Sequence, residues 1–209
     1  MGRWFLKAGW RKVRGIVPQT TKSRMAAWAG FDLSTTGLGL GVRSEEGDEA
    51  YVHVDMRGRK TWHGQPAFAL EHAPRMIQTL IDKLAEQDWA FDGTFISFAV
   101  RQHDMVLLDS AGQLLMPALS WQCHAACQET HQLRKQGAED VVGRVEERFI
   151  LPKLMWALRQ DRRLGKAIHC AMTTGDWIAY RLTGAARLST SDALSNGLLV
   201  QKSKRLAAD

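Results

Sequence analysis

The sequence predicts a mixed α/β domain on three observations. Hydrophobic residues make up 45% of the 209 residues and charged residues 24%, which is the balance of an ordinary folded domain and not of a disordered chain. Short apolar runs bounded by turn residues alternate with segments in which apolar residues recur at helical spacing. No run of about 18 apolar residues occurs, so the sequence predicts no transmembrane helix and no stable membrane insertion.

Three short strands are expected first. An apolar run from Ala26 to Phe31 is followed by a turn and by alternating residues from Leu38 to Val42, which is typical of two adjacent strands. A third strand is expected at residues 51–54, and a helix over 76–84 follows Pro74, which suits a first helical turn. The other expected elements are strands at 95–100 and 105–108 and helices at 124–136, 154–164 and 177–182, the last ended by Gly184.

Basic residues are concentrated at the start of the chain. Residues 1–31 contain seven Lys and Arg and no acidic residue, whereas the rest contains 21 basic and 22 acidic residues. We therefore divide the sequence into a basic extension, residues 1–24, and a domain, residues 25–209. Three interpretations of the extension stay open: a segment with no role in the fold, an amphipathic helix for a membrane surface, or a targeting segment. The nearly neutral domain predicts no nucleic-acid partner.

The segment from Asp32 to Gly37 is the strongest candidate for chemistry. Its sequence, Asp-Leu-Ser-Thr-Thr-Gly, lies at the junction of the first two expected strands. A carboxylate at a strand end can hold Mg²⁺, and a turn rich in hydroxyls and Gly offers hydrogen-bond donors to phosphate oxygens. Phosphoryl transfer requires both features. The alternative is an Asx turn that only joins two strands.

Five segments in order, over about residues 27–200, resemble the N-terminal domain of the FGGY carbohydrate kinase family, in its xylulokinase-like and fuculokinase-like branch. Residues 30–37 are similar to the opening Gly-Ile-Asp-x-Gly-Thr-Thr loop of that family. Residues 95–109, FISFAVRQHDMVLLD, are similar to its sugar-contacting strand pair, and residues 113–122, QLLMPALSWQ, to the segment that ends in a Trp. Residues 151–156, LPKLMW, are similar to its Pro-Lys-Leu-x-Trp signature, and GDWIAYRLTG followed by Ser-Asp-Ala at 191–193 to its last motif.

The resemblance implies a ribonuclease H-like domain of the actin-like ATPase type, with a mixed five-stranded sheet flanked by helices. It also implies ATP and Mg²⁺ as cofactors and a sugar or polyol as the bound small molecule. Asp32 would be the catalytic and Mg²⁺-binding residue, and the nucleotide phosphates would lie against Asp32, Ser34, Thr35 and Thr36. The residues implied to contact the sugar are Arg101, Gln102, His103 and Trp121.

Three positions depart from the family pattern. Ser34 replaces the usual Gly, Gly39 stands where many members have Lys, and Cys123 stands where xylulokinases often have Asp. The resemblance therefore does not identify the sugar. The general-base Asp of the family and its C-terminal nucleotide domain lie beyond the position that matches Asp209, so we expect this chain to lack both.

The sequence therefore predicts the N-terminal domain of an ATP-dependent sugar kinase that transfers the γ-phosphate to a hydroxyl of a ketose or polyol such as xylulose. The chain alone is expected to be inactive and to need the missing C-terminal kinase domain as its partner. The alternative is a non-catalytic fragment or pseudo-kinase that acts as a sugar-binding or interaction module. A homodimer stays open, and an odd number of three cysteines favours a reducing, cytoplasmic compartment over a disulfide framework.

Several other polar and aromatic residues have a structural interpretation. Lys153 is expected as a surface lysine at a helix start, Trp156 and Trp177 as core anchors, and Asp192 with Ser191 as a helix cap. Cys123 and His131 are eight residues apart, which on a straight helix is about 12 Å and too far for one Zn²⁺. If the chain were active by itself, Asp104 and Asp192 would be the first candidates for a general base.

Overall fold

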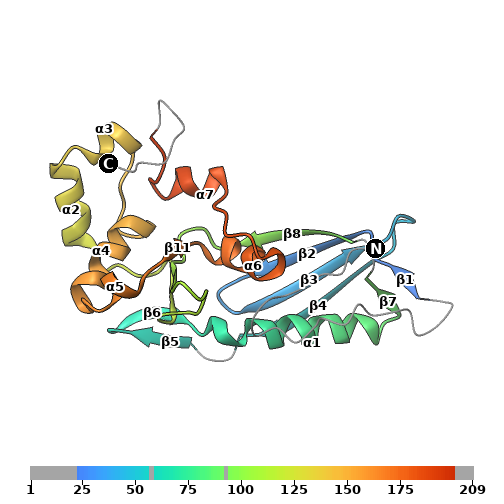
Figure 1. Cartoon of the computed structure of the whole chain (residues 1–209). Helices are drawn as coiled ribbons and strands as arrows, with labels where there is room; N and C mark the ends of the chain where they lie inside the picture. The colour runs from blue at the N-terminus through green and yellow to red at the C-terminus, as the bar shows by residue number, and fades with distance from the viewer. Residues whose placement is uncertain (1–22, 57–58, 92–93, 201–209) are drawn as a thin grey trace. The chain divides into compact units, whose positions relative to one another are not determined.

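The computed structural model describes residues 23–56, 59–91 and 94–200 (Figure 1). The chain forms two compact units. Unit 1 takes in the described residues up to position 57 and Glu71–Val100, and unit 2 takes in those of 58–70 and from Arg101 onward. Most of the predicted basic extension lies outside the described residues.

Unit 1 is built on a four-stranded mixed sheet with the order β4-β3-β2-β8. The first three strands are antiparallel to one another, and β8 runs parallel to β2. The predicted meander of three strands and the predicted helix are therefore confirmed. The elements of this unit are β1 (Arg24–Met25), β2 (Trp28–Leu33), β3 (Gly37–Arg43), β4 (Glu49–Asp55), α1 (Ala73–Ala85), β7 (Trp89–Ala90) and β8 (Phe95–Val100).

Alternation along the strands decides which face of this sheet is buried. In β2, Ala29, Phe31 and Leu33 are buried, whereas Trp28 and Asp32 are exposed on the opposite face. Helix α1 packs along β3 and β4 (Figure 1) and buries Ala73, Ile77, Leu80 and Leu84, which recur at helical spacing. Asp32 therefore lies on the face of the sheet opposite the core of unit 1.

The mixed α/β class is confirmed, but the expected five-stranded sheet has four strands among the described residues. The next strand along the chain, β9 (Val106–Leu108), pairs antiparallel with β11 (Cys170–Met172) in unit 2 and not with the sheet of unit 1. The partner strand is only three residues long, and so short a segment carries no detectable alternation in the sequence.

Unit 2 combines two small sheets with most of the helices. The described helices of the chain are short, α1 being the longest with 13 residues, and none of them is both long and apolar enough to cross a membrane. The remaining elements are β5 (Arg59–Trp62), β6 (Gln65–Phe68), η1 (Leu70–His72, at the junction with unit 1), β9, β10 (Ala118–Leu119), α2 (Cys127–Lys135), α3 (Ala138–Val142), α4 (Ile150–Gln160), α5 (Leu164–Ala167), β11, α6 (Thr174–Thr183) and α7 (Thr190–Ser195).

Local sequence explains the ends of several unit 2 elements. Gly184 ends α6 in the left-handed conformation, with φ of 75°, as predicted. The β5–β6 hairpin was not predicted; its two turn residues, His63 and Gly64, both have positive φ, as a type I′ turn requires. Helix α7 exists, but its cap is Ser189, whose hydroxyl accepts the Asp192 N–H. The prediction of Asp192 as the cap is wrong, because this residue lies in the first turn.

The core of unit 2 gathers around α4 and β9. Trp156 packs edge-on against Trp62 with ring centroids 5.4 Å apart, and both Trp156 and Trp177 are buried. Their prediction as core anchors is confirmed. This core includes Met105, at the end of the loop between β8 and β9 that contains three of the predicted sugar-contacting residues.

Candidate functional site

The Ser34–Gly37 turn of unit 1 is closed by the side chain of Ser34. Its hydroxyl accepts hydrogen bonds from the N–H groups of Thr36, at 3.2 Å, and Gly37, at 3.1 Å, and lies 3.1 Å from the Thr36 hydroxyl. The Ser34 N–H also donates to the Gly37 carbonyl. The N–H groups of Thr36 and Gly37, which we expected to bind a phosphate, are therefore already bonded to the Ser34 side chain within the turn.

Asp32 lies one residue before the end of β2, on the open face of the unit 1 sheet. Its carboxylate is exposed, and within residues 23–200 as described it has no hydrogen bond or ion pair. An unpaired carboxylate at the surface fits a Mg²⁺ that keeps most of its waters. Among the described residues no three His, Cys, Asp or Glu side chains gather closely enough to hold a metal. A cation at Asp32 would thus need phosphate and water as its other ligands.

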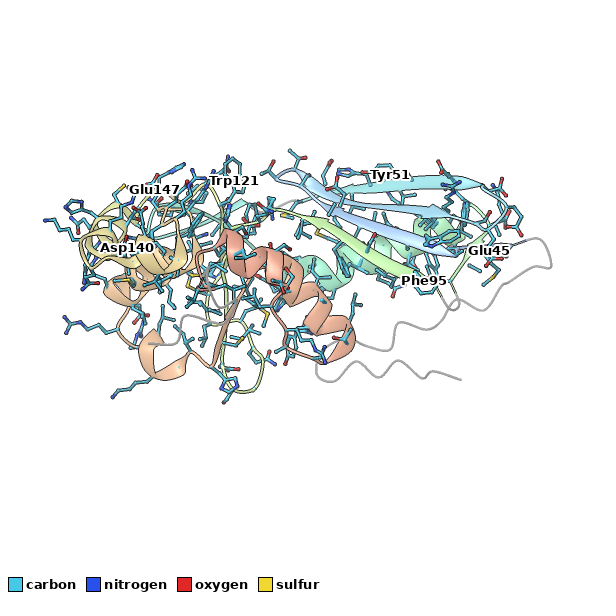
Figure 2. All side chains as sticks on the ribbon, turned by 90° about the horizontal axis from the view of Figure 1, so that it is seen from above. Glu45, Tyr51, Phe95, Trp121, Asp140 and Glu147 are labelled. Atoms are coloured by element: carbon cyan, nitrogen blue, oxygen red, sulfur yellow. The ribbon has the colours of Figure 1, made fainter. Side chains whose placement is uncertain are left out.

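Glycines and aromatic residues shape the open face beside Asp32. The face is hollowed into a depression of about 600 Å³, which is lined by Tyr51 of β4, a residue labelled in Figure 2. The Tyr51 ring lies over Gly39, the residue paired with Asp32, and a Cβ at position 39 would come within 2.7 Å of the ring atom Cζ. The residues that line the depression include Trp28, Gly30, Gly41, Arg43, Tyr51 and Ser97.

In unit 2, the buried carboxylate of Asp104 joins two of the predicted sugar-contacting residues. Oδ2 accepts a hydrogen bond from Arg101 Nε at 2.7 Å, and Oδ1 accepts one from the Trp121 backbone N–H at 2.8 Å. Thr174 Oγ1 donates to Oδ2 at 3.3 Å. Burial raises the pKa of Asp104, and the Arg101 guanidinium opposes that shift. Because Asp104 is fully buried and accepts three hydrogen bonds, it holds the site together and is not placed to act as a general base.

Lys153 lies in α4 and binds backbone carbonyl groups of the loop at 101–104 and of Ser120. Its ammonium group donates to the His103 carbonyl and, at 3.4 Å, to the Ser120 carbonyl. The side chain is completely buried, so its prediction as a surface lysine is wrong. Burial lowers the pKa of Lys153 to about 8, and the nearby Asp104 carboxylate opposes that shift. The sequence could not indicate this, since a Lys at a helix start is normally exposed.

The remaining predicted sugar-contacting residues lie next to these buried charges. His103 is half-buried, and its Nδ1 lies 3.2 Å from Asn196 Oδ1, while Gln102 is exposed in the turn. The Arg101 guanidinium lies over the Phe68 ring, 3.7 Å from its centroid. Trp121 is half-buried and is labelled in Figure 2.

The structure thus brings Arg101, His103 and Trp121 together in unit 2, and Asp32 with the Ser34–Gly37 turn in unit 1. Sequence reasoning missed Asn196, which contacts His103, and the buried role of Lys153. The available signal for Asn196 was its position three residues after the Ser-Asp-Ala motif.

Comparisons with known proteins identify the family of the chain. Residues 27–202 match the family described as the FGGY family of carbohydrate kinases, N-terminal domain. The xylulose kinase of Staphylococcus xylosus is 29% identical over 179 residues, which is 81% of this chain and 36% of the relative. The xylulose kinase of Escherichia coli K12 is 25% identical over 174 residues, which is 79% of this chain and 35% of the relative. The chain therefore spans about a third of the length of these relatives.

Solved structures support the same fold. A ligand-bound xylulose kinase from Lactobacillus acidophilus superimposes with a TM-score of 0.75 at 20% identity, covering 88% of this chain and 38% of the other. A glycerol kinase from Plasmodium falciparum, solved with ADP, gives a TM-score of 0.74 at 12% identity, covering 88% and 39%. The fold of this chain is therefore that of the sugar kinases on the actin-like ATPase fold. Because the family match covers most of its residues, the chain belongs to the FGGY family of carbohydrate kinases and corresponds to the N-terminal domain of that family.

Proposed function

We propose that this chain is the sugar-binding half of a cytoplasmic, ATP-dependent carbohydrate kinase that phosphorylates a hydroxyl of a ketose or polyol such as xylulose. The observation that carries the proposal is the loop at 101–104, which the buried Asp104 and Lys153 hold against Trp121. Such a preorganised set of one Arg, one His and one Trp offers hydrogen bonds and a stacking surface to a sugar.

The residues of unit 1 would take the phosphate side of the reaction. Asp32 would hold Mg²⁺ through its exposed carboxylate, and the hydroxyls of Thr35 and Thr36 would face the nucleotide phosphates. Bound Mg²⁺ neutralises charge on the transferring phosphoryl group. No residue of this chain is proposed as the general base, which we assign to the C-terminal domain.

A turnover assay tests the proposal. The 209-residue chain with MgATP and xylulose, fuculose or glycerol should release no ADP above background. A chimera in which the C-terminal domain of the Staphylococcus xylosus xylulose kinase follows this chain should release ADP with at least one of these sugars. In the chimera, Asp32→Ala should lower kcat at least about 100-fold, as expected for the loss of a group that stabilises transition-state charge. Normal turnover by the variant would remove Asp32 from the mechanism.

One observation favours the alternative of a non-catalytic sugar-binding module. The turn amides of Thr36 and Gly37 are bonded to Ser34, so the turn offers fewer donors to a phosphate. If the alternative is correct, the chimera should bind xylulose with no ADP release, and Ser34→Gly should start turnover if the occupied donors are the cause.

A further inference from the structure

The His103 imidazole is held on two sides by groups that do not titrate. Nδ1 lies 3.2 Å from Asn196 Oδ1, and the ring stacks on Phe149 with centroids 5.1 Å apart and planes 24° apart. Asn196 and Phe149 are both buried. In the described part of the chain, Nε2 of His103 has no hydrogen-bond partner, so it is the ring nitrogen left for a ligand.

The orientation of the Asn196 amide follows from its other contacts. Its Nδ2 donates to the Asp192 carbonyl at 2.9 Å, and its Oδ1 accepts the Ile150 N–H at 3.2 Å. A flipped amide would set two donors against each other at Ile150 and two acceptors against each other at Asp192. The oxygen must therefore face His103. Because a carbonyl oxygen only accepts, the hydrogen of the pair belongs to His103 Nδ1.

We infer that Asn196 is a positioning residue that fixes His103 as the Nδ1–H tautomer, so that Nε2 presents a lone pair and recognises a ligand hydroxyl as a hydrogen-bond donor. The recognition step rests on the proposed function, whereas the tautomer does not. An unrestrained imidazole favours the opposite tautomer, with the hydrogen on Nε2, so the contact with Asn196 has a measurable consequence.

The charges around the ring favour its neutral form. Burial lowers the pKa of His103 below its usual value, the Asn196 hydrogen bond opposes this shift, Arg148 and Lys153 lower the pKa further, and Glu146 raises it. At neutral pH the ring therefore acts through Nε2 as an acceptor. When the ring is protonated, Nε2 becomes a donor and binds an acceptor atom of the ligand instead of a hydroxyl hydrogen.

The chemistry of the ligand follows from this assignment. A free hydroxyl of a ketose or polyol can donate to Nε2, whereas a methoxy group or a fluorine at the same carbon can only accept. Losing one such hydrogen bond should weaken binding by up to about tenfold. This preference belongs to one hydroxyl of the sugar, the one that reaches His103.

Nitrogen NMR of the ligand-free chain with labelled histidine tests the tautomer directly. The His103 signals are identified by their loss in His103→Gln, and we expect a protonated Nδ1 and an unprotonated Nε2. Asn196→Ala should shift the ring toward the Nε2–H form, whereas Asn196→Asp keeps an acceptor and should retain Nδ1–H. His124, whose Nδ1 lies 2.6 Å from Glu147 Oε1, is the matched control and should not change in either variant. An Nε2–H tautomer in the unmodified chain would overturn the inference, even if Asn196→Ala fails to fold.

Binding of xylulose and its mono-O-methyl derivatives, measured by titration at pH 7.5, tests the consequence for recognition. One methyl derivative should bind up to about tenfold more weakly than xylulose, and the deficit should shrink in Asn196→Ala. Equal affinities for all derivatives at pH 7.5 would refute recognition through Nε2. If xylulose does not bind at all while the Nδ1–H tautomer is observed, the proposed function fails and the role of Asn196 stands.

Discussion

At residue 34, the Ser34 hydroxyl accepts hydrogen bonds from two N–H groups of the turn that we propose to face the nucleotide phosphates. Replacing Ser34 by Gly should free the Thr36 and Gly37 N–H groups, which now bond to Ser34 Oγ at 3.2 and 3.1 Å. Hydrogen bonds to charged groups contribute about 1.5–3 kcal/mol, so we expect the affinity for MgADP to rise at least about tenfold. Titration calorimetry of the chain with MgADP measures this change.

Ser34→Ala separates the hydroxyl from backbone flexibility. The Ala variant also lacks the acceptor but keeps a Cβ, so it should gain as much affinity as the Gly variant if the freed donors are the cause. An unchanged affinity in both variants would show that this turn does not contact the phosphates.

At residue 153, a buried ammonium group makes stability depend on alkaline pH. Lys153→Met should lower the free energy of unfolding by about 1–3 kcal/mol, because it leaves the His103 and Ser120 carbonyls unbonded. The Lys153 pKa of about 8 lies below its unfolded value of 10.5, so between these pH values the unfolded chain binds more protons and stability rises with pH. The advantage of the unmodified chain over Lys153→Met should therefore grow from pH 8 to 10.5.

Urea unfolding of both proteins at pH 7, 8, 9 and 10 measures this difference. Comparing the two chains cancels the titration of groups that do not interact with Lys153. The Cys123 thiol, whose pKa burial raises and Lys153 lowers, does not cancel and is removed from both chains by Cys123→Ala. A difference that stays constant with pH would show that Lys153 is not perturbed by burial.

Within the β2–β3 hairpin, two glycines should respond in opposite ways to the same substitution. A Cβ at Gly37 would come within 2.5 Å of the Val54 carbonyl oxygen, whereas at Gly41 the nearest atom is 3.7 Å away. Gly37→Ala should destabilise unit 1 by about 1–3 kcal/mol through overpacking. Gly41→Ala should be neutral or stabilise by up to about 1 kcal/mol, since it removes the entropy that Gly loses in a strand. Thermal unfolding of both variants checks the pair, and equal midpoints would contradict it.

Strand β1 limits how many N-terminal residues can be deleted without loss of stability. Arg24 N–H donates to the Asp88 carbonyl at 2.7 Å, and the Arg24 guanidinium lies 5.6 Å from the centroid of the buried Trp89 ring. Deletion of residues 1–22 should leave the unfolding midpoint within a few degrees, whereas deletion of 1–25 should lower the free energy of unfolding by about 1–3 kcal/mol. Circular dichroism melting curves of the two truncated chains measure the difference. Equal midpoints would show that β1 does not stabilise unit 1.

The elements that the sequence predicts well are those with a local signal. Pro74 at the start of α1 and Gly184 at the end of α6 each satisfy a backbone requirement that neighbouring residues do not alter. The β5–β6 hairpin lacked such a signal, because His63 takes a positive φ that is usual for Asn or Gly. The pairing of β9 with β11 was not predictable, since it joins segments about 60 residues apart.

For the molecule as a whole, the proposed function predicts weak sugar binding by this chain alone. The chain spans about a third of its curated relatives, so a bound sugar would keep much of its surface in water. Tight small-molecule sites bury about 70–90% of the ligand surface, and we therefore expect dissociation constants of about a millimolar or weaker for xylulose. Titration calorimetry with xylulose, fuculose and glycerol tests this. Micromolar binding that His103→Gln does not weaken would place the sugar elsewhere.

The candidate site was predictable to the extent that its residues lie in contiguous motifs. The Asp32 turn and the Arg101–His103 loop can be located in the sequence without the structure. Lys153 and Asn196 could not be assigned a role in this way, because they reach His103 from residues 50 and 93 positions away. Their effect depends on tertiary packing around α4 and the end of α7.

The contact between Tyr51 and Gly39 makes the side chains allowed at these two positions depend on each other. A side chain at position 39 can be accommodated only if the aromatic ring leaves, and an aromatic ring at position 51 can settle there only if position 39 has no side chain. A Lys at position 39 is therefore compatible with a small residue at 51 but not with this tyrosine in its present orientation. Gly39→Lys therefore requires the exposed Tyr51 ring to turn away or to be replaced by a smaller side chain, so its effect should depend on the residue at position 51.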